Sequence, residues 1–241
     1  MNIREINSFI YYHLGLVKNI FIHIPKNGGV SVRKHPELTN RVVSADPYFH
    51  LSRDYSKKLH VAMKLRGEHH GFQHARYRDI AHKVRSRLQA VAVVRNPWSR
   101  VVSRYRFART AIENGKAPSN YVPDSFEGFL EERFVYGNEE YYWHRAIRGW
   151  YPQLEHLINE EGEVGVDVLR FENLNKEAVR YFNLKKGLDY RNVTTGKHAS
   201  YQEYYTDYTR QLVADWYLDD IDYFGFEFNG TATKNTYFVD Y

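Results

Sequence analysis

Two short apolar runs set the strongest limit on how this chain of 241 residues can fold. Residues 19–24 end at Pro25, and residues 89–94 end at the turn 95–97. Each run is too short for a helix and too continuously apolar for a strand with one face in water. We expect both to be buried parallel strands, and we expect a less pure run at 166–171 to be a third strand.

Helical patterns fill the rest of the chain between these runs. Apolar residues recur at helical spacing over 75–88, 96–115, 126–134, 173–182 and 201–224. Strands that alternate with helices predict an α/β fold with a central parallel sheet flanked by helices, and a ligand site beyond the carboxyl ends of the strands. Because no repeat or linker divides the sequence, we expect a single domain over 1–241, with a motif core at 19–228 and a C-terminal tail at 229–241.

Composition excludes several classes of protein. The chain has no cysteine, which rules out a disulfide scaffold, a thiolate zinc site and an iron–sulfur cluster. Its most apolar early stretch, residues 9–24, contains two histidines, a lysine and an asparagine, so no membrane span is expected. The same stretch lacks the pattern of a secretory signal, and we therefore expect a cytoplasmic protein.

Charge is segregated along the sequence. Residues 53–109 hold 15 Lys or Arg and 3 acidic residues, whereas residues 201–241 hold 2 and 8. This pattern indicates that the middle of the chain faces an anion, either nucleic acid or a phosphorylated small molecule.

The first candidate site follows the first expected strand, at residues 25–31. Gly28 and Gly29 allow a tight turn close to a ligand, and a helix that begins there would direct unpaired N–H groups at a phosphate or sulfate. Lys26 adds a positive charge and Ser31 adds a hydroxyl. The loop resembles a P-loop in kind, but its lysine precedes the glycines, unlike the loop of nucleoside triphosphatases.

The second candidate site follows the second expected strand. Arg95 leaves the sheet at the same edge as Lys26, and Ser103 lies two helical turns along the helix that starts beside it. A guanidinium and a hydroxyl in this arrangement suit a second phosphate.

Together the two segments resemble the sulfotransferase superfamily. Residues 22–31 (IHIPKNGGVS) are similar to its 5′-phosphosulfate loop, and residues 93–105 (VVRNPWSRVVSRY) are similar to its 3′-phosphate segment. The branch most resembled contains the heparan sulfate 2-O-sulfotransferases and bacterial carbohydrate sulfotransferases. Weaker likeness at 168–174, 201–205 and 219–228 extends the resemblance over most of the chain.

This resemblance implies transfer of a sulfuryl group from 3′-phosphoadenosine 5′-phosphosulfate (PAPS) to a hydroxyl, leaving 3′,5′-adenosine bisphosphate (PAP), with no metal required. It implies that Lys26 stabilises the departing phosphate, that the loop holds the 5′-phosphate, and that Arg95 and Ser103 hold the 3′-phosphate. The residues implied to bind the donor are Lys26, Asn27, Gly28, Gly29, Val30, Ser31, Arg95, Ser103 and, in a late loop, Lys197. Asn27 and Val30 stand where many family members have Ser or Thr.

An acceptor hydroxyl needs a general base, and histidine is the natural candidate. Five of the 12 histidines fall between residues 60 and 82. By the resemblance His74 is the closest match to the base, with His70 and His69 as alternates. His70 and His74 would share a face of a helix and could bind a metal, but Gly71 argues against a helix there.

Two other functions remain open at this point. A nucleotide-dependent small-molecule kinase would use the same fold, although no Walker lysine is present. A nucleic-acid-binding domain would use the basic middle segment. For the sulfotransferase we expect a small-molecule or glycan acceptor and no nucleic-acid partner, and the sequence does not indicate an oligomeric state.

Overall fold

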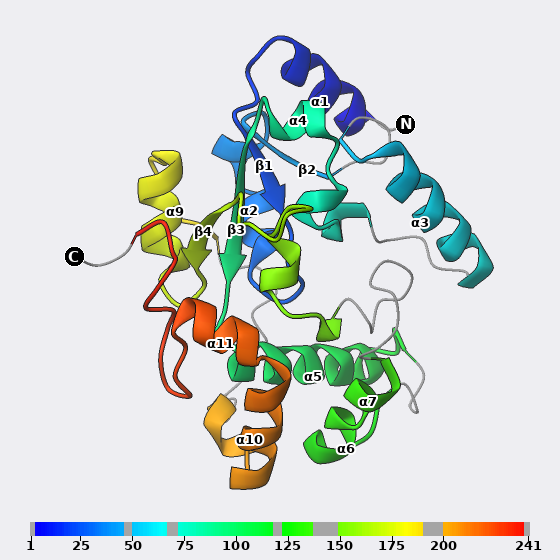
Figure 1. The fold of residues 1–241 in the computed structure, drawn as a ribbon, viewed down its shortest axis with the longest axis vertical. Helices are drawn as coiled ribbons and strands as arrows, with labels where there is room; N and C mark the ends of the chain where they lie inside the picture. The colour runs from blue at the N-terminus through cyan, green and yellow to red at the C-terminus, as the bar shows by residue number, and fades with distance from the viewer. Residues whose placement is uncertain are drawn as a thin grey trace.

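The computed structural model describes residues 3–45, 50–66, 72–117, 122–136, 149–189 and 200–238. At its centre is a four-stranded sheet with strand order β2-β1-β3-β4 and parallel pairing throughout (Figure 1). The strands are β1 (Asn19–Ile22), β2 (Val42–Ser44), β3 (Gln89–Val94) and β4 (Asp167–Arg170). The α/β class and the three expected strands are confirmed, while β2 is an edge strand that the sequence analysis missed.

Helices cover the sheet on both faces and at both ends (Figure 1). The α-helices are α1 (Ile3–His13), α2 (Gly29–Arg33), α3 (Arg53–Arg66), α4 (His82–Arg85), α5 (Pro97–Glu113), α6 (Phe126–Leu130), α7 (Glu132–Tyr136), α9 (Leu174–Phe182), α10 (Asp207–Trp216) and α11 (Leu218–Phe224). Short 3₁₀ helices lie at Pro36–Leu38, Phe72–His74, Tyr77–Asp79, Leu154–His156 and Tyr201–Tyr204.

Side chains alternate between two cores, one on each face of the sheet. Ile20, Ile22 and Val168 belong to the larger core with α3, α4, α5 and the C-terminal helices. Phe21 and Leu169 face the smaller core, which contains residues of α2 and α9. This alternation on fully buried strands explains why the strands are continuously apolar in sequence.

The predicted helix over 75–88 was wrong. The carboxylate of Asp79 accepts hydrogen bonds from the backbone N–H and the guanidinium of Arg76, which closes a 3₁₀ turn at Tyr77–Asp79. Ile80 is then extended and forms an antiparallel bridge with Leu51, so only the short α4 remains helical.

Two further predicted helices are interrupted. The segment 201–224 divides into a 3₁₀ helix, α10 and α11, because Thr206 caps α10 with a hydrogen bond from Thr209 N–H to its hydroxyl, and Tyr217 separates α10 from α11. The segment 126–134 is two short helices, α6 and α7, with Glu131 between them.

The carboxyl ends of the strands point toward α5, which begins directly after β3 (Figure 1). Asn96 caps this helix by accepting a hydrogen bond from Ser99 N–H, and Pro97 occupies the first helical position. The Asn96 amide also donates to the carbonyls of Glu227 and Gly230. The helix start and the C-terminal loop are therefore fixed together at the sheet edge where a ligand is expected.

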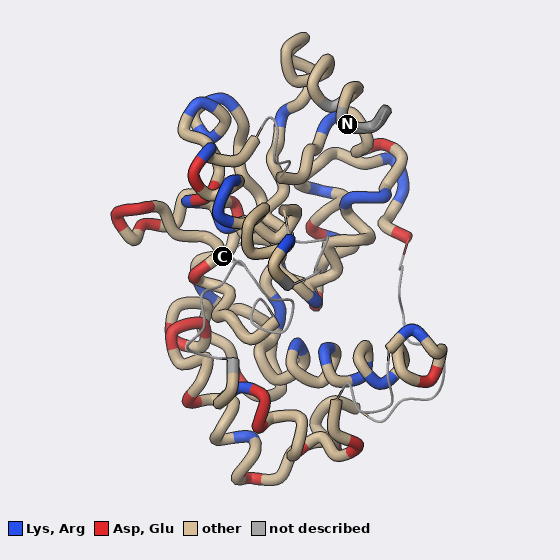
Figure 2. The backbone as a smooth tube through the Cα atoms, turned by 90° about the vertical axis from the view of Figure 1, so that its right-hand side faces the viewer, with Lys and Arg blue, Asp and Glu red and all other residues tan. Residues whose placement is uncertain are grey.

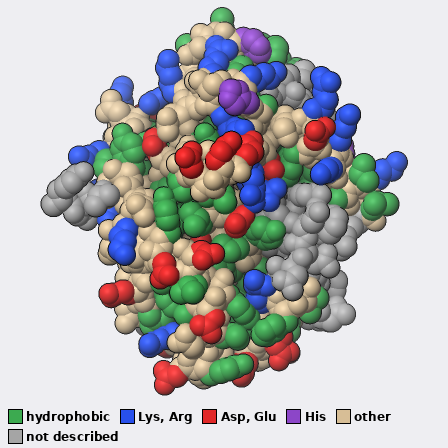
Figure 3. All heavy atoms as spheres, viewed as in Figure 1, with side chains coloured by type: hydrophobic (Ala, Val, Ile, Leu, Met, Phe, Trp, Pro, Cys, Tyr) green, Lys and Arg blue, Asp and Glu red, His purple; other side chains and the backbone are tan. Residues whose placement is uncertain are grey.

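Charge in the folded chain follows the segregation seen in the sequence. Figure 2 shows Lys and Arg along α5 and acidic residues on the C-terminal helices, and Figure 3 shows acidic side chains along the lower part of one face. No helix in the described ranges is both long enough and apolar enough to cross a bilayer.

Candidate active site

The loop after β1 is a tight turn whose backbone passes twice through the left-handed region. Lys26 and Gly28 both adopt left-handed conformations, with φ of 69° and 75°, and Gly28 is the N-cap of α2. A Cβ atom on Gly28 would lie 2.9 Å from Leu174 Cδ2 and 3.1 Å from the ring of Phe171. A side chain there would be both strained and crowded, so the turn requires glycine.

Gly29 is required for a different reason. A Cβ atom on Gly29 would lie 2.2 Å from Cδ2 of His23, closer than any real contact. The backbone at the start of α2 therefore passes directly against the His23 ring. The first N–H groups of α2 have no partner within the helix, as at every helix start.

Asn27 and Ser31 complete the loop in different ways. Asn27 is 1% exposed, and its Nδ2 donates to Val93 O and to Gln153 Oε1, each at 2.7 Å. Both donor hydrogens of Asn27 are used inside the protein, so its side chain supports the loop and has no donor left for a phosphate. Ser31 is buried in the first turn of α2, where its backbone N–H donates to Gly28 O.

Arg95 lies at the end of β3 and reaches back to the loop after β1. Its Nη1 donates to Lys26 O at 3.1 Å, its Nε donates to Ser99 Oγ at 2.9 Å, and its guanidinium stacks 4.1 Å from the centroid of the Phe171 ring. Burial lowers the pKa of Arg95 to about 10, which leaves the group charged at neutral pH. Arg95 and the Lys26 loop, which were singled out separately in the sequence, are therefore in direct contact.

Ser103 lies between these two groups along α5. Ser99, Ser103 and Phe107 are four residues apart and share one face of the helix. Ser99 contacts Arg95, and Phe107 lies under Lys26, whose Nζ is 3.9 Å from the ring centroid. The partly buried Ser103 thus occupies the middle of a face that contacts Arg95 at one end and Lys26 at the other.

Lys26 is held in an unusual electrostatic environment. Burial, with smaller contributions from the positive charges of Arg95 and Arg104, lowers the pKa of its ammonium group from 10.5 to about 7. A bound anion would reverse this shift, because it offsets the positive charges that surround Lys26. The site therefore favours a negatively charged ligand, because without one the protonated form of Lys26 is destabilised by burial and by the neighbouring positive charges.

His74 lies beside the same loop, at the end of the 3₁₀ helix Phe72–His74. Its Nδ1 is 2.8 Å from the carbonyl oxygen of His23, and its ring centroid is 4.5 Å from that of the His23 ring. A carbonyl oxygen accepts only, so Nδ1 of His74 carries the proton and donates it. Nε2 of the neutral ring is then the basic nitrogen.

Two buried histidines neighbour His74. His23 and His156 are 6% and 0% exposed, and burial lowers the pKa of each well below 6.5, with the charge of His74 contributing to both shifts. Both rings are therefore neutral at physiological pH, and the His23 ring lies directly beside that of His74.

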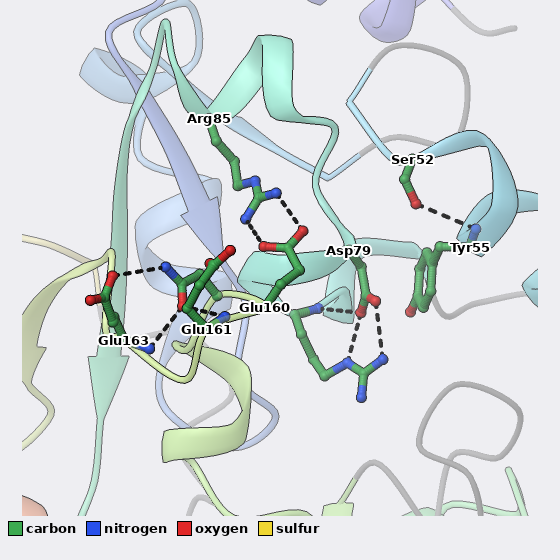
Figure 4. Close-up of polar contacts among 9 residues, drawn as sticks. Ser52, Tyr55, Asp79, Arg85, Glu160, Glu161 and Glu163 are labelled. Atoms are coloured by element: carbon green, nitrogen blue, oxygen red, sulfur yellow. Dashed lines mark hydrogen bonds and ion pairs between the residues drawn. The ribbon is translucent and has the colours of Figure 1, made fainter.

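The segment that follows His74 is tied down by ion pairs. Figure 4 shows the two hydrogen bonds between Arg85 of α4 and Glu160, at 2.6 and 2.7 Å, and the carboxylate of Asp79 within its own turn. Arg78 pairs in addition with Glu155 at 2.6 Å. These contacts hold residues 78–85, which follow His74, against the segment 155–160.

Three predicted residues lie outside the described ranges. His69 and His70, the alternates for the base, and Lys197, the late-loop candidate, belong to segments that the structure does not describe. The alternative metal site at His70 and His74 falls there as well. Within the described ranges, no group of three or more His, Asp or Glu residues is placed to hold a metal ion.

Sequence reasoning missed two buried side chains that organise the site. Arg100 is 2% exposed, and its guanidinium donates to Pro25 O at 3.2 Å and to Tyr151 O at 2.9 Å. Its place within the second motif was a usable signal. Gln153 is fully buried and contacts both Asn27 and Arg95, but a single glutamine in a loop gives no sequence signal.

A pocket of about 270 Å³ opens beside Arg95. It is lined by Asn96, Ser99, Phe171, Glu172, Tyr201, Gln202, Asn229, Gly230 and Thr231. Two of these residues, Ser99 and Phe171, are the direct contacts of the Arg95 guanidinium, so the pocket adjoins that cation. Its aromatic side chains can pack against a flat ring, and its backbone and polar side chains can hydrogen-bond to one.

Comparison with known proteins gives one match. The model of a family described as the sulfotransferase domain matches residues 15–231, which include both loops, α5 and the C-terminal helices. Neither the curated proteins nor the solved structures include a significant match to the chain. The family match favours the sulfotransferase reading over the kinase and nucleic-acid alternatives.

Proposed function

Because the chain belongs to the sulfotransferase family and is thus an enzyme that takes its sulfuryl group from PAPS, we propose that it sulfates a hydroxyl of a carbohydrate or small molecule, with His74 as general base. The observation that carries this proposal is the convergence of Lys26, Arg95 and His74 around the single loop after β1. We also propose that the chain belongs to the heparan sulfate 2-O-sulfotransferase-like branch, because its two motifs are most similar to those of that branch.

The residues present fit a donor with two phosphate groups. Gly28 caps the start of α2, where the first backbone N–H groups have no partner within the helix, and Lys26 and Arg95 supply cations beside this turn. When bound, the donor supplies the sulfuryl group and a nucleotide phosphate that departs with negative charge. In our proposal the backbone N–H groups of Gly28, Gly29 and Val30, with the Ser31 hydroxyl, hold the 5′ end.

Arg95 and Ser103 hold the 3′-phosphate in this proposal. The guanidinium already lies at the pocket beside Ser99, and Ser103 lies one turn further along the same face of α5. We place the adenosine in the pocket of about 270 Å³, where Phe171 and Tyr201 offer aromatic surface. Lys197 is kept as a further candidate for the phosphates.

Lys26 and His74 perform complementary tasks in the transfer. Lys26, protonated in the complex, stabilises charge on the departing phosphate. His74 accepts the acceptor's proton at Nε2, because its Nδ1–H is held by His23 O. The hydrogen bond from Nδ1 fixes the orientation of the ring, and the imidazolium that forms keeps the same bond. Positioning and charge stabilisation then supply most of the rate enhancement, as in phosphoryl transfer.

The proposal is tested first by ligand selectivity. Thermal unfolding is followed with PAP, ADP, AMP and ATP with Mg²⁺, each at the same concentration. PAP should raise Tm most, because it alone of the four carries a 3′-phosphate for Arg95 and Ser103. A preference for ATP with Mg²⁺ would contradict the proposal and support the kinase alternative.

The acceptor is tested with the loaded enzyme. Radiolabelled sulfate from PAPS should appear in a hydroxyl-bearing glycan or small molecule when a panel of such acceptors is supplied. His74→Ala should slow this transfer by at least about 100-fold while PAP still raises Tm as in the natural enzyme. Full transfer by that variant would rule out His74 as the base.

A further inference from the structure

The side chain of Gln153 joins the two loops proposed to hold the donor. Its Oε1 accepts hydrogen bonds from Asn27 Nδ2 at 2.7 Å and from Arg95 N–H at 2.9 Å, and its Nε2 donates to Arg95 O at 2.9 Å. One carboxamide thus pairs with both backbone groups of Arg95, as a residue of a neighbouring strand would. Asn27 belongs to the Lys26 loop, so the same carboxamide fixes that loop as well.

Gln153 is itself held by a buried carboxylate. Asp220 of α11 is 0% exposed, and its Oδ2 accepts from the backbone N–H of Gln153 at 2.8 Å and from Nε2 at 3.3 Å. Its Oδ1 accepts from Leu154 N–H at 2.8 Å. The carboxylate therefore fixes both Gln153 and the residue that follows it.

The hydrogen bonds of Gln153 link the ends of β1 and β3 beyond the point where the two strands pair through their backbones. The register between β1 and β3 ends at the pair Ile22 and Ala92, before either Lys26 or Arg95 is reached. Beyond that pair, the segments that follow β1 and β3 carry the groups proposed to bind opposite ends of one ligand. Gln153 forms hydrogen bonds with both segments, at the point where β1 and β3 no longer pair.

We propose that Gln153 is a positioning residue for the donor, which sets the spacing between the loop that holds the 5′-phosphate and the segment that holds the 3′-phosphate. This inference rests on the proposed function. A ligand with a phosphate at each end gains affinity from both sites only when they are held at its own spacing. A ligand with a single phosphate does not depend on that spacing.

The test compares PAP with AMP, which carries only the 5′-phosphate. Dissociation constants for both are measured by calorimetry with the natural enzyme, with Gln153→Met and with Gln211→Met. Methionine keeps the length of the side chain and removes its hydrogen bonds. We expect Gln153→Met to lose at least tenfold in its preference for PAP over AMP, with AMP affinity changed by less than threefold. Gln211 is exposed on α10, and its variant should match the natural enzyme.

A second variant guards against misfolding of the first. Asp220→Asn keeps the size of the side chain but removes one acceptor for Gln153 and Leu154, and it touches neither loop. We expect it to lose about threefold in the preference for PAP, in the same direction as Gln153→Met.

Other outcomes would overturn the inference. If PAP and AMP weaken by the same factor in the folded variants, Gln153 only supports the fold, and the proposed spacing role is wrong. The same holds if neither affinity changes in the variants. A natural enzyme that does not prefer PAP over AMP would instead refute the proposed donor site, so the two failures are distinguishable.

Discussion

Ionisation of Lys26 should control how tightly the enzyme binds its nucleotide. The pKa of this ammonium group is about 7 in the protein without ligand, chiefly because the group is buried. At pH 7 about half of the molecules therefore carry a neutral Lys26. Phosphate binding favours the charged form, so binding at higher pH requires the uptake of one proton.

The direction and size of the effect follow from proton linkage. A group that is protonated in the complex but not in the free enzyme weakens binding as pH rises above its free pKa, by up to tenfold per pH unit. From pH 7 to pH 9 the affinity for PAP should fall about 50-fold. Phosphate groups titrate near pH 6, so the ligand adds little over this range.

Calorimetric titration with PAP measures both the affinity and the number of protons taken up on binding. Titrations at pH 7, 8 and 9, in pairs of buffers with different ionisation enthalpies, give the affinity and the number of protons taken up. Lys26→Arg is the matched control, because a guanidinium stays protonated throughout the range and should give a nearly flat profile. A flat profile for the natural enzyme, or an equal slope for Lys26→Arg, would refute the reasoning.

Three further predictions concern single side chains. Arg95→Ala should remove most of the Tm increase caused by PAP and leave that caused by AMP nearly unchanged, since only PAP has the second phosphate. His74→Ala should lower kcat by about 10²- to 10⁴-fold, the usual contribution of a general base, with an unchanged Kd for PAP by calorimetry; a kcat within threefold of the natural value would contradict it. Gly29→Ala should lower the free energy of unfolding by about 1–3 kcal/mol, because its Cβ atom would overlap His23, and denaturant unfolding measures this loss. Gly230→Ala, whose Cβ atom meets nothing closer than 3.5 Å, is the control for unfolding and should be near neutral.

Features encoded in contiguous residues were predictable from the sequence. β1 and β3 follow from continuous apolar runs, and the start of α5 follows from Asn96 and Pro97. The contact of Arg95 with the Lys26 loop follows from a general rule, since adjacent parallel strands end at the same edge of a sheet. These elements require no knowledge of distant residues.

Features that depend on distant contacts were not predictable. The three-residue strand β2 gains its order from pairing with β1, and the expected helix at 75–88 is broken partly by a bridge from Ile80 to Leu51. The role of Gln153 depends on Asp220, which is 67 residues away in sequence. Local pattern gives no indication of such pairings, because their stability comes from the assembled fold.

The hydrogen bond from His74 to the carbonyl of His23 has a consequence for how the acceptor specificity of this enzyme can evolve. The group proposed to accept the proton is held by a residue only three positions from the group proposed to stabilise the leaving phosphate. The proposed base and the lysine proposed to stabilise the leaving group are thus both positioned by one short stretch of backbone after β1. Residues elsewhere that recognise the acceptor can then diverge without altering the alignment of these two groups. The same pair of catalytic groups can therefore act on many different acceptors.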